Sequence, residues 1–314
     1  MTVLLILALA FPPALARVPP AVAAPSVPSV SAESWVVFDD AYGYEVASRH
    51  PDRRAPMAST TKLMTALLVV ENANLADSVT ISRRAEATGH KQIWLRQGDE
   101  WVVEELLEAL LVVSANDAAV ALAEHVGGDV GSFVSLMNRR AAELGMADTS
   151  FANPHGLDAS GHHTTAHDLL VLARQVMESP VLARMATRTA ATLVNGDGAA
   201  TRWESTNELL GEFEGAIGLK TGWTTKAREV LVAVAERGDR RIYAVVMGSE
   251  DASRAAARLL EHGFAVFGPA ERRLVPLMED RHHAAELRQS LASDTLARVV
   301  HLRGLALRSS APWE

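Results

Sequence analysis

The sequence of 314 residues contains no cysteine, and aromatic residues make up only 5% of it. Without cysteine the protein can have no disulfide, no thiolate nucleophile and no cysteine-ligated metal or iron–sulfur site. Few aromatic residues argue against a platform on which nucleic-acid bases could stack. The formal net charge of −8 points the same way, because nucleic-acid binding requires a basic face. We therefore expect no nucleic-acid partner.

Lysine is scarce as well. The 30 basic residues include four lysines, namely Lys62, Lys91, Lys220 and Lys226, and arginine supplies the remainder. A motif that contains lysine has little chance of arising at random in such a chain. Any lysine in a recognisable motif is therefore a strong candidate for chemistry.

Residues 1–24 are expected to be a secretory signal peptide. An unbroken apolar run from Val3 to Phe11 is followed by small residues spaced for cleavage, although the first basic residue is Arg17. The run is shorter than the stretch of about 20 apolar residues that spans a bilayer as a helix. We expect export to the periplasm or another extracytoplasmic part of the cell envelope; the alternative is an apolar tail without a targeting role. Residues 25–33 are predicted to be a Pro-rich linker.

The remaining chain has strand patterns at both ends and helical patterns between them. The apolar periodicities predict, in chain order, strands at 35–38 and 44–46, helices at 59–72, 104–113, 118–126, 131–144 and 165–177, strands at 230–235 and 241–248, and a helix at 253–264. Such an order favours an α+β fold in which both termini contribute to one antiparallel sheet around a helical insertion.

Ser59-Thr60-Thr61-Lys62 is the first motif that carries chemistry. A serine hydroxyl needs a nearby base to become a nucleophile, and residues at i and i+3 of a helix share one face. Lys62 can therefore reach Ser59, which would lie at a helix N-terminus, where negative charge is favoured. The alternative is that Ser59 only caps the helix.

Two further motifs follow. Ser114-Ala115-Asn116 lies between two predicted helices, where a hydroxyl and an amide can project into a cleft; the alternative is a capping turn. Lys220-Thr221-Gly222 is predicted to be a strand, and Gly222 would let a substrate backbone lie alongside it as an added strand. The alternative there is an ordinary exposed edge strand.

Together, S-x-x-K, S-x-N and K-T-G in this order resemble the pattern of penicillin-binding proteins and β-lactamases. Longer segments are similar to those of the low-molecular-mass penicillin-binding proteins, the serine D-Ala-D-Ala carboxypeptidases: residues 57–71, 114–128, 151–169 and 206–224. The resemblance implies a catalytic domain at 34–268 with the β-lactamase/transpeptidase-like α+β fold. That fold has about five antiparallel strands flanked by helices, with an all-helical subdomain.

The resemblance also implies roles for residues. Ser59 would be the nucleophile, Lys62 the base, Ser114 the proton relay to the leaving amine, and Asn116 the residue that holds Lys62 and the substrate amide. Lys220 would supply positive field, and Thr221 would bind the terminal carboxylate beside Gly222. The N–H groups of Ser59 and Trp223 would form the oxyanion hole. Arg254, in the loop after the last strand, would bind the carboxylate.

The implied activity is removal of the terminal D-Ala from peptidoglycan stem peptides, with β-lactam antibiotics as covalent inhibitors and no cofactor. A β-lactamase, a D,D-endopeptidase and a non-catalytic peptidoglycan-binding protein remain alternatives. The last gains weight because Arg228-Glu229 stands where the family tends to have glycine and an aromatic residue.

Two other features are open at this point. His162, His163 and His167 form a local cluster, for which a metal site is the alternative to a structural role. Residues 269–314 form an arginine-rich tail that we expect to be disordered or partly helical, with association with an acidic membrane surface as the alternative.

Overall fold

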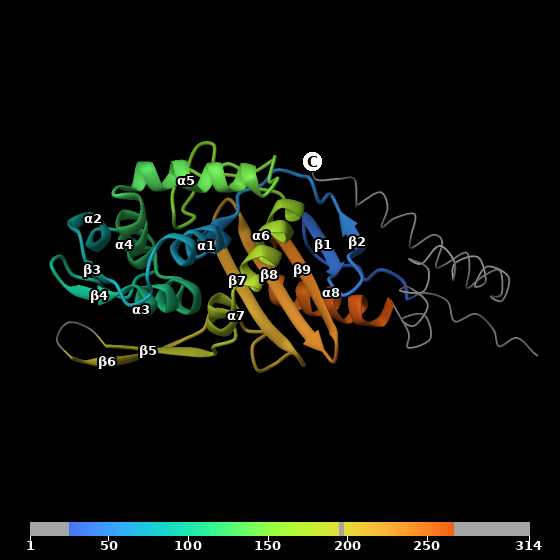
Figure 1. Cartoon of the computed structure of the whole chain (residues 1–314). Helices are drawn as coiled ribbons and strands as arrows, with labels where there is room; N and C mark the ends of the chain where they lie inside the picture. The colour runs from blue at the N-terminus through green and yellow to red at the C-terminus, as the bar shows by residue number, and fades with distance from the viewer. Residues whose placement is uncertain (1–24, 195–197, 267–314) are drawn as a thin grey trace, which may run out of the picture.

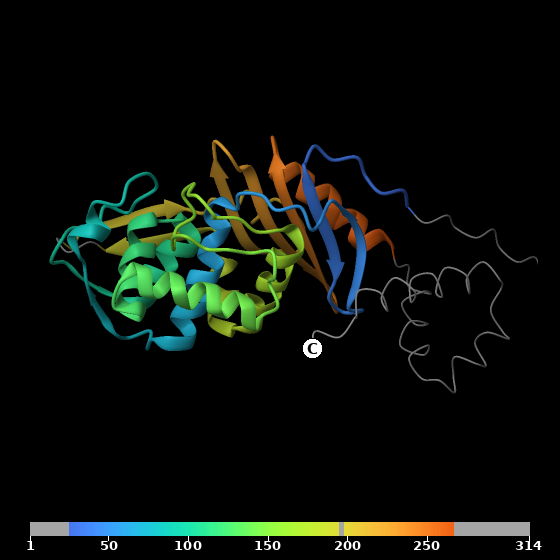
Figure 2. The same cartoon turned by 90° about the horizontal axis from the view of Figure 1, so that it is seen from above.

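The computed structural model describes residues 25–194 and 198–266, and its central element is a five-stranded antiparallel sheet (Figures 1 and 2). The strand order is β2-β1-β9-β8-β7. Its strands are β1 (Ser34–Asp39), β2 (Tyr44–Arg49), β7 (Ala216–Thr224), β8 (Arg228–Arg237) and β9 (Arg240–Ser249). Because β1 pairs with β9, with Val36 opposite Val245, strands from both ends of the described chain form one sheet. The predicted α+β architecture is confirmed.

The two faces of the sheet bury different sets of side chains because successive strand residues point to opposite faces. On β8, Leu231 and Ala233 belong to the hydrophobic cluster of α8 (Ala252–Val266). Val232 belongs to the larger cluster, which includes α1 (Lys62–Asn72) and α6 (Ala166–Glu178). Figure 1 shows α6 and α8 on opposite faces of the sheet.

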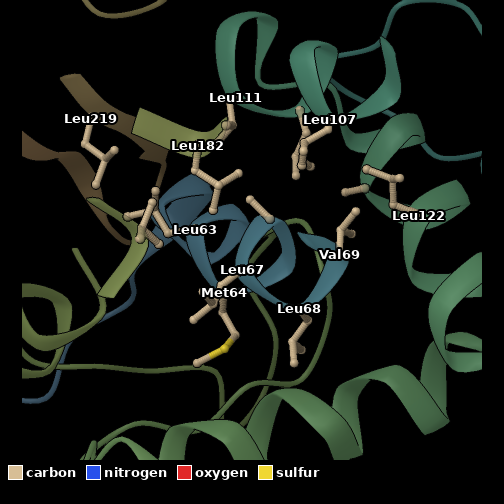
Figure 3. Packing of buried hydrophobic residues seen from close by; sticks show 14 of the residues in the cluster. Leu63, Met64, Leu67, Leu68, Val69, Leu107, Leu111, Leu122, Leu182 and Leu219 are labelled. Atoms are coloured by element: carbon tan, nitrogen blue, oxygen red, sulfur yellow. The ribbon is translucent and has the colours of Figure 1, made fainter. Parts of the chain in front are cut away.

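Helix α1 is the centre of the helical part of the molecule. Every residue from Lys62 to Val69 is buried, so the helix packs on nearly all sides, as its sequence predicts. Figure 3 shows its leucines directed towards different neighbours, with Leu107, Leu122 and Leu182 around them. Full burial of each large aliphatic side chain stabilises the fold by about 1.5–3 kcal/mol. The turn that precedes α1 is therefore attached to a rigid element.

Other elements surround α1 or extend from it. These are α2 (Arg83–Glu86), α3 (Val103–Glu108), a π-helical turn (Ala109–Val113), α4 (Asn116–Gly127), α5 (Val130–Glu143), α7 (Pro180–Ala186), and the hairpins β3 (Ser78–Thr80)–β4 (Glu100–Val102) and β5 (Ala190–Val194)–β6 (Ala200–Glu204). The two small hairpins and the helices α2 and α7 were not predicted, because segments of three to seven residues are too short to show a periodicity.

The expected terminal segments are largely outside the described residues. The predicted signal peptide, 1–24, and the predicted tail, 269–314, both lie there. Residues 25–33 contain no helix or strand, but Val30 is buried against the sheet, and Glu33 N–H donates to the Met247 carbonyl. Within 25–194 and 198–266, no helix has the length and apolarity needed to cross a membrane.

His167 joins α6 to the edge of the sheet through two carboxylates. Its Nε2 lies 2.7 Å from Glu45 Oε2, and its Nδ1 lies 2.6 Å from Asp52 Oδ1. The hydrogen bond to Glu45 is the main cause that raises the pKa of His167 above its usual 6.5. A raised pKa in the folded state stabilises the protein fully below the unfolded-state pKa, and this contribution is lost as pH rises through the folded-state pKa.

We therefore expect His167→Gln to destabilise the protein by about 0.5–1 kcal/mol below pH 6 and by less at alkaline pH. Urea unfolding at a series of pH values measures the difference. His163→Gln is the matched control, because among the described residues no carboxylate lies within ion-pair distance of His163. A difference between wild type and His167→Gln that does not change with pH would contradict the prediction.

Candidate active site

Ser59 lies in a 3₁₀ turn, Ala58–Thr61, that leads directly into α1. The sequence predicted a continuous α-helix from Ser59, whereas the structure begins with a 3₁₀ turn in which two threonine hydroxyls bind carbonyls three residues back. Thr60 Oγ1 donates to the Met57 carbonyl at 2.6 Å, and Thr61 Oγ1 donates to the Ala58 carbonyl at 2.8 Å. In a 3₁₀ turn, residues i and i+3 eclipse one another, and Lys62 Nζ lies 3.0 Å from Ser59 Oγ.

Lys62 is buried and has three hydrogen-bond acceptors. Its Nζ donates to Ser59 Oγ, to Asn116 Oδ1 at 2.7 Å and to the His155 carbonyl at 2.6 Å. Burial, followed by the charges of Lys220 and Lys91, holds the pKa of Lys62 well below its usual 10.5. The amine therefore loses its proton far more readily than an exposed lysine, and its lone pair is then available next to Ser59.

The second motif lies at the end of the π-helical turn. Ser114 adopts a left-handed conformation with φ 67°, which ends that turn, and Asn116 begins α4. Asn116 also holds the neighbouring loop, because its N–H donates to the Lys91 carbonyl at 2.8 Å and its Nδ2 to the Gly89 carbonyl at 3.1 Å. Ser114 and Asn116 both line a pocket, as expected of a break between two helices.

The third motif, on β7, packs against the turn of Ser59. A Cβ atom on Gly222 would lie 2.7 Å from the Ser59 nitrogen, so a side chain here would push the strand off the turn. Lys220 is buried, its Nζ donates to the Thr221 carbonyl at 2.9 Å, and burial is the main cause that lowers its pKa to about 7. Thr221 Oγ1 lies 2.5 Å from Thr206 Oγ1. The side chain of Trp223 is exposed at the pocket.

The pocket has a volume of about 980 Å³ and lies where the helical part meets the β7 edge of the sheet. It brings together most of the residues that the sequence singled out: Ser59, Ser114, Asn116, Thr221, Gly222 and Trp223. Lys62 and Lys220 lie behind its wall and reach it through their contacts with Ser59 and Thr221. The three motifs thus form one site.

Arg254 is not among the residues that line this pocket. The role implied by the resemblance placed it in a loop after the last strand, but α8 begins at Ala252, close to the start of the predicted helix at 253–264, and Arg254 is an exposed residue of its first turn. Its N–H donates to Asp251, which lines the pocket together with Glu229 and Glu250. The position of Arg254 therefore gives no support to a carboxylate-binding role.

Arg228, the departure from the family pattern, also lies close to this wall. It begins β8 in a left-handed conformation, with φ 57°, and its guanidinium pairs with Glu250. Glu229 accepts a hydrogen bond from the Ala252 N–H at 2.7 Å and so caps α8. Both charged residues are thus engaged within the protein at the edge of the site.

Residues 151–165 supply contacts that the sequence did not predict. Gly156, with φ 96°, packs so closely on the Ser59 turn that a Cβ there would lie 1.9 Å from the Ala58 oxygen. His162 is buried behind the turn, with Nε2 2.8 Å from Thr61 Oγ1. Lys91 lines the pocket as the third lysine at the site, and the rarity of lysine was the signal that could have found it.

The cluster of three histidines does not converge on one point. His162 contacts Thr61, His163 Nδ1 lies 3.1 Å from the Gly161 oxygen, and His167 lies between Glu45 and Asp52. Within the described part of the chain, no group of three or more histidine, aspartate or glutamate side chains is arranged to hold a metal ion.

Known proteins are similar to this chain in sequence and in fold. The model of the D-alanyl-D-alanine carboxypeptidase family, peptidase S11, matches residues 21–251. The chain is 35% identical to the D-alanyl-D-alanine carboxypeptidase DacB2 of Mycobacterium tuberculosis over 80% of its length and 88% of that protein. It is 33% identical to DacF of Bacillus subtilis over 75% of its length, and it spans 63% of DacF.

Solved structures of such enzymes have a similar fold. A D-alanyl-D-alanine carboxypeptidase from Mycobacterium tuberculosis superposes with a TM-score of 0.74 at 33% identity, covering 81% of this chain and 97% of that one. The DD-transpeptidase of Streptomyces K15 gives 0.72 at 30% identity, covering 76% and 99%. The residues of three motifs line one pocket in the fold of these enzymes, and the chain belongs to the peptidase S11 family of D-alanyl-D-alanine carboxypeptidases.

Proposed function

We propose that this protein is a serine D,D-carboxypeptidase that removes the terminal D-Ala from peptidoglycan stem peptides through an acyl-enzyme on Ser59. One observation carries the proposal. A buried lysine whose pKa is well below its usual value lies 3.0 Å from a serine hydroxyl at the wall of a pocket. That is the arrangement of a nucleophile with its base.

The reaction then proceeds in two steps. Neutral Lys62 accepts the Ser59 proton while Ser59 Oγ attacks the carbonyl carbon between the two D-alanines, and the oxyanion is held by the N–H groups of Ser59 and Trp223. The C–N bond breaks, and the proton passes through Ser114 to the leaving amine. Water then attacks the ester, restores the Ser59 hydroxyl and releases the shortened peptide.

Binding uses the other side of the pocket. The substrate backbone lies along β7, where Gly222 leaves room for close approach, and Asn116 holds the peptide amide. The Thr221 hydroxyl donates to the terminal carboxylate, and Lys220 supplies positive charge behind it. β-Lactam antibiotics acylate the same serine, and the protein acts outside the cytoplasm, where its substrate occurs.

A D,D-transpeptidase is the second candidate, because the similar protein of Streptomyces K15 is described as a DD-transpeptidase. It would use the same residues and the same acyl-enzyme, with a peptide amine in place of water in the second step. An assay with and without an added amino acceptor separates the two by the product formed.

We expect Ser59→Ala to abolish both D-Ala release from a pentapeptide and covalent labelling by a fluorescent penicillin, because the proposed acyl-enzyme is an ester of the Ser59 hydroxyl. Wild type should show both activities, and penicillin should inhibit D-Ala release. Ser253→Ala, at another wall of the pocket, is the matched control and should remain active. Equal labelling of wild type and Ser59→Ala, or labelling of neither, would overturn the proposal. Rapid turnover of the penicillin would instead identify a β-lactamase.

A further inference from the structure

His162 is the buried end of a chain of hydrogen bonds that leads to the peptide bond in front of Ser59. The Ala152 N–H donates to His162 Nδ1 at 3.0 Å, and His162 Nε2 lies 2.8 Å from Thr61 Oγ1. Thr61 Oγ1 lies 2.8 Å from the Ala58 oxygen. The three contacts connect the 151–165 segment with the 3₁₀ turn.

The donor and the acceptor of each of these hydrogen bonds follow from where the protons lie. Nδ1 faces an N–H donor, so it carries no proton, and a neutral ring must then carry its proton on Nε2. The ring is neutral at physiological pH because burial lowers the pKa of His162 to about 4. Nε2–H therefore donates to Thr61 Oγ1, and the single Thr61 hydroxyl proton points to the Ala58 oxygen.

The Ala58 oxygen belongs to the same peptide group as the Ser59 N–H. A trans peptide is planar, with its C=O and N–H directed oppositely, so fixing the Ala58 oxygen fixes the direction of the Ser59 N–H. Ala58 has φ 48°, a left-handed conformation that costs a non-glycine residue about 1–2 kcal/mol and needs support from its surroundings. Thr61 and the close packing of Gly156 against the Ala58 oxygen provide that support.

We propose that His162 is a positioning residue that, through Thr61 and the Ala58 carbonyl, orients and polarises the Ser59 N–H as a donor of the oxyanion hole. The hydrogen bonds of such a chain polarise one another, so the Ser59 N–H becomes a stronger donor when its carbonyl accepts a bond from Thr61. The inference rests on the proposed function, because it assigns the Ser59 N–H to the oxyanion of the acylation step.

Two matched pairs of variants test it. Thr61→Val keeps the shape of the side chain but removes the hydroxyl, whereas Thr61→Ser keeps the hydroxyl. His162→Asn keeps an acceptor for the Ala152 N–H but cannot reach Thr61, whereas the amide of His162→Gln reaches Thr61 and donates to it. The measurements are kcat and KM for D-Ala release and the rate constant of acylation by penicillin.

We expect Thr61→Val and His162→Asn to lower kcat and the acylation rate constant about 10-fold or more with little change in KM, a loss below that of removing an oxyanion-hole donor. Thr61→Ser and His162→Gln should stay within about 3-fold of wild type, and the double variant Thr61→Val/His162→Asn should lose little more than Thr61→Val alone. Affinity for a boronic acid that forms a tetrahedral adduct on Ser59 should fall in parallel with kcat.

The outcomes separate this inference from the proposed function. If wild type releases D-Ala and binds penicillin but Thr61→Val matches it, the relay is wrong and the function stands. If both members of each pair lose activity in proportion to thermal stability, or if KM changes in place of kcat, His162 has a merely structural role. If Thr61→Val does not fold, the comparison of His162→Asn with His162→Gln decides. A wild type that binds no penicillin overturns the proposed function itself.

Discussion

Lys62→Arg is expected to lower the rate constant of penicillin acylation by roughly 10²–10⁴-fold, the usual contribution of a general base. A guanidinium does not give up its proton in proteins, so it can neither accept the Ser59 proton nor become neutral beside Ser59 Oγ. Lys62→Met should show a similar loss and keep the fold, because an apolar side chain of similar size is readily buried there. Lys226→Arg, on the exposed turn between β7 and β8, is the matched control and should remain active.

Lys220→Arg is expected to behave differently from Lys62→Arg. Lys220 acts through its positive charge, and a guanidinium carries that charge as well as an ammonium does. The pKa of Lys220 is about 7, so its positive charge is lost as pH rises through that value, whereas the base form of Lys62 increases with pH. The profile of kcat/KM in wild type should therefore fall on its alkaline side near pH 7, and Lys220→Arg should remove that fall.

A Lys62→Arg variant that acylates at the wild-type rate would exclude Lys62 as the base.

Arg240→Met is expected to lower the free energy of unfolding by about 3–5 kcal/mol, because it leaves the carboxylate of Asp39 buried without its partner. Both side chains are almost fully buried, with Arg240 Nε 3.0 Å from Asp39 Oδ2. Burial is the largest influence on Asp39 and raises its pKa even beside the guanidinium. Arg240 also donates to the carbonyls of Gly263 and Phe264 in the last turns of α8.

Urea unfolding monitored by circular dichroism measures this effect. Arg54→Met is the matched control, because Arg54 and Asp148 form an exposed pair that contributes at most about 1 kcal/mol. The double variant Arg240→Met/Asp39→Leu should be less destabilised than Arg240→Met, because it leaves no charge unpaired. Equal losses for Arg240→Met and Arg54→Met would contradict the prediction.

The spacing of residues in the sequence was enough to predict contacts within one turn. Ser59 and Lys62 are three residues apart, and this separation brings them together in an α-helix or a 3₁₀ turn, so the contact did not depend on the type of helix. The break at Ser114 was predicted because one apolar periodicity, 104–113, ends before it and another, 118–126, begins after it. An antiparallel sheet to which both ends of the chain contribute followed from the strand patterns, whereas its size of about five strands was implied by the resemblance to the family.

Spacing and periodicity in the sequence could not predict the contacts between segments that are far apart in the chain. The start of α8 agrees within one residue with the predicted helix at 253–264, but the cap that Glu229 supplies to it from β8 was not predicted. The contact of His162 with Thr61 depends on how the 151–165 segment packs behind α1, and Gly156 reveals that packing only through its distance to the Ala58 oxygen. No periodicity in the sequence encodes these distances.

Sequence patterns alone were enough to predict the family and the residues of the proposed chemistry. A chain with four lysines and no cysteine keeps Lys62 three residues after Ser59 and Lys220 in a second motif, and an amine at Lys62 can accept a proton where a guanidinium cannot. Only the packing of the folded chain shows how Lys62, Lys220 and the Ser59 N–H are prepared for that chemistry. Burial lowers the pKa of both lysines, and the 151–165 segment and β7 pack against the turn that carries the Ser59 N–H, because desolvation and peptide orientation depend on neighbours that are remote in the chain.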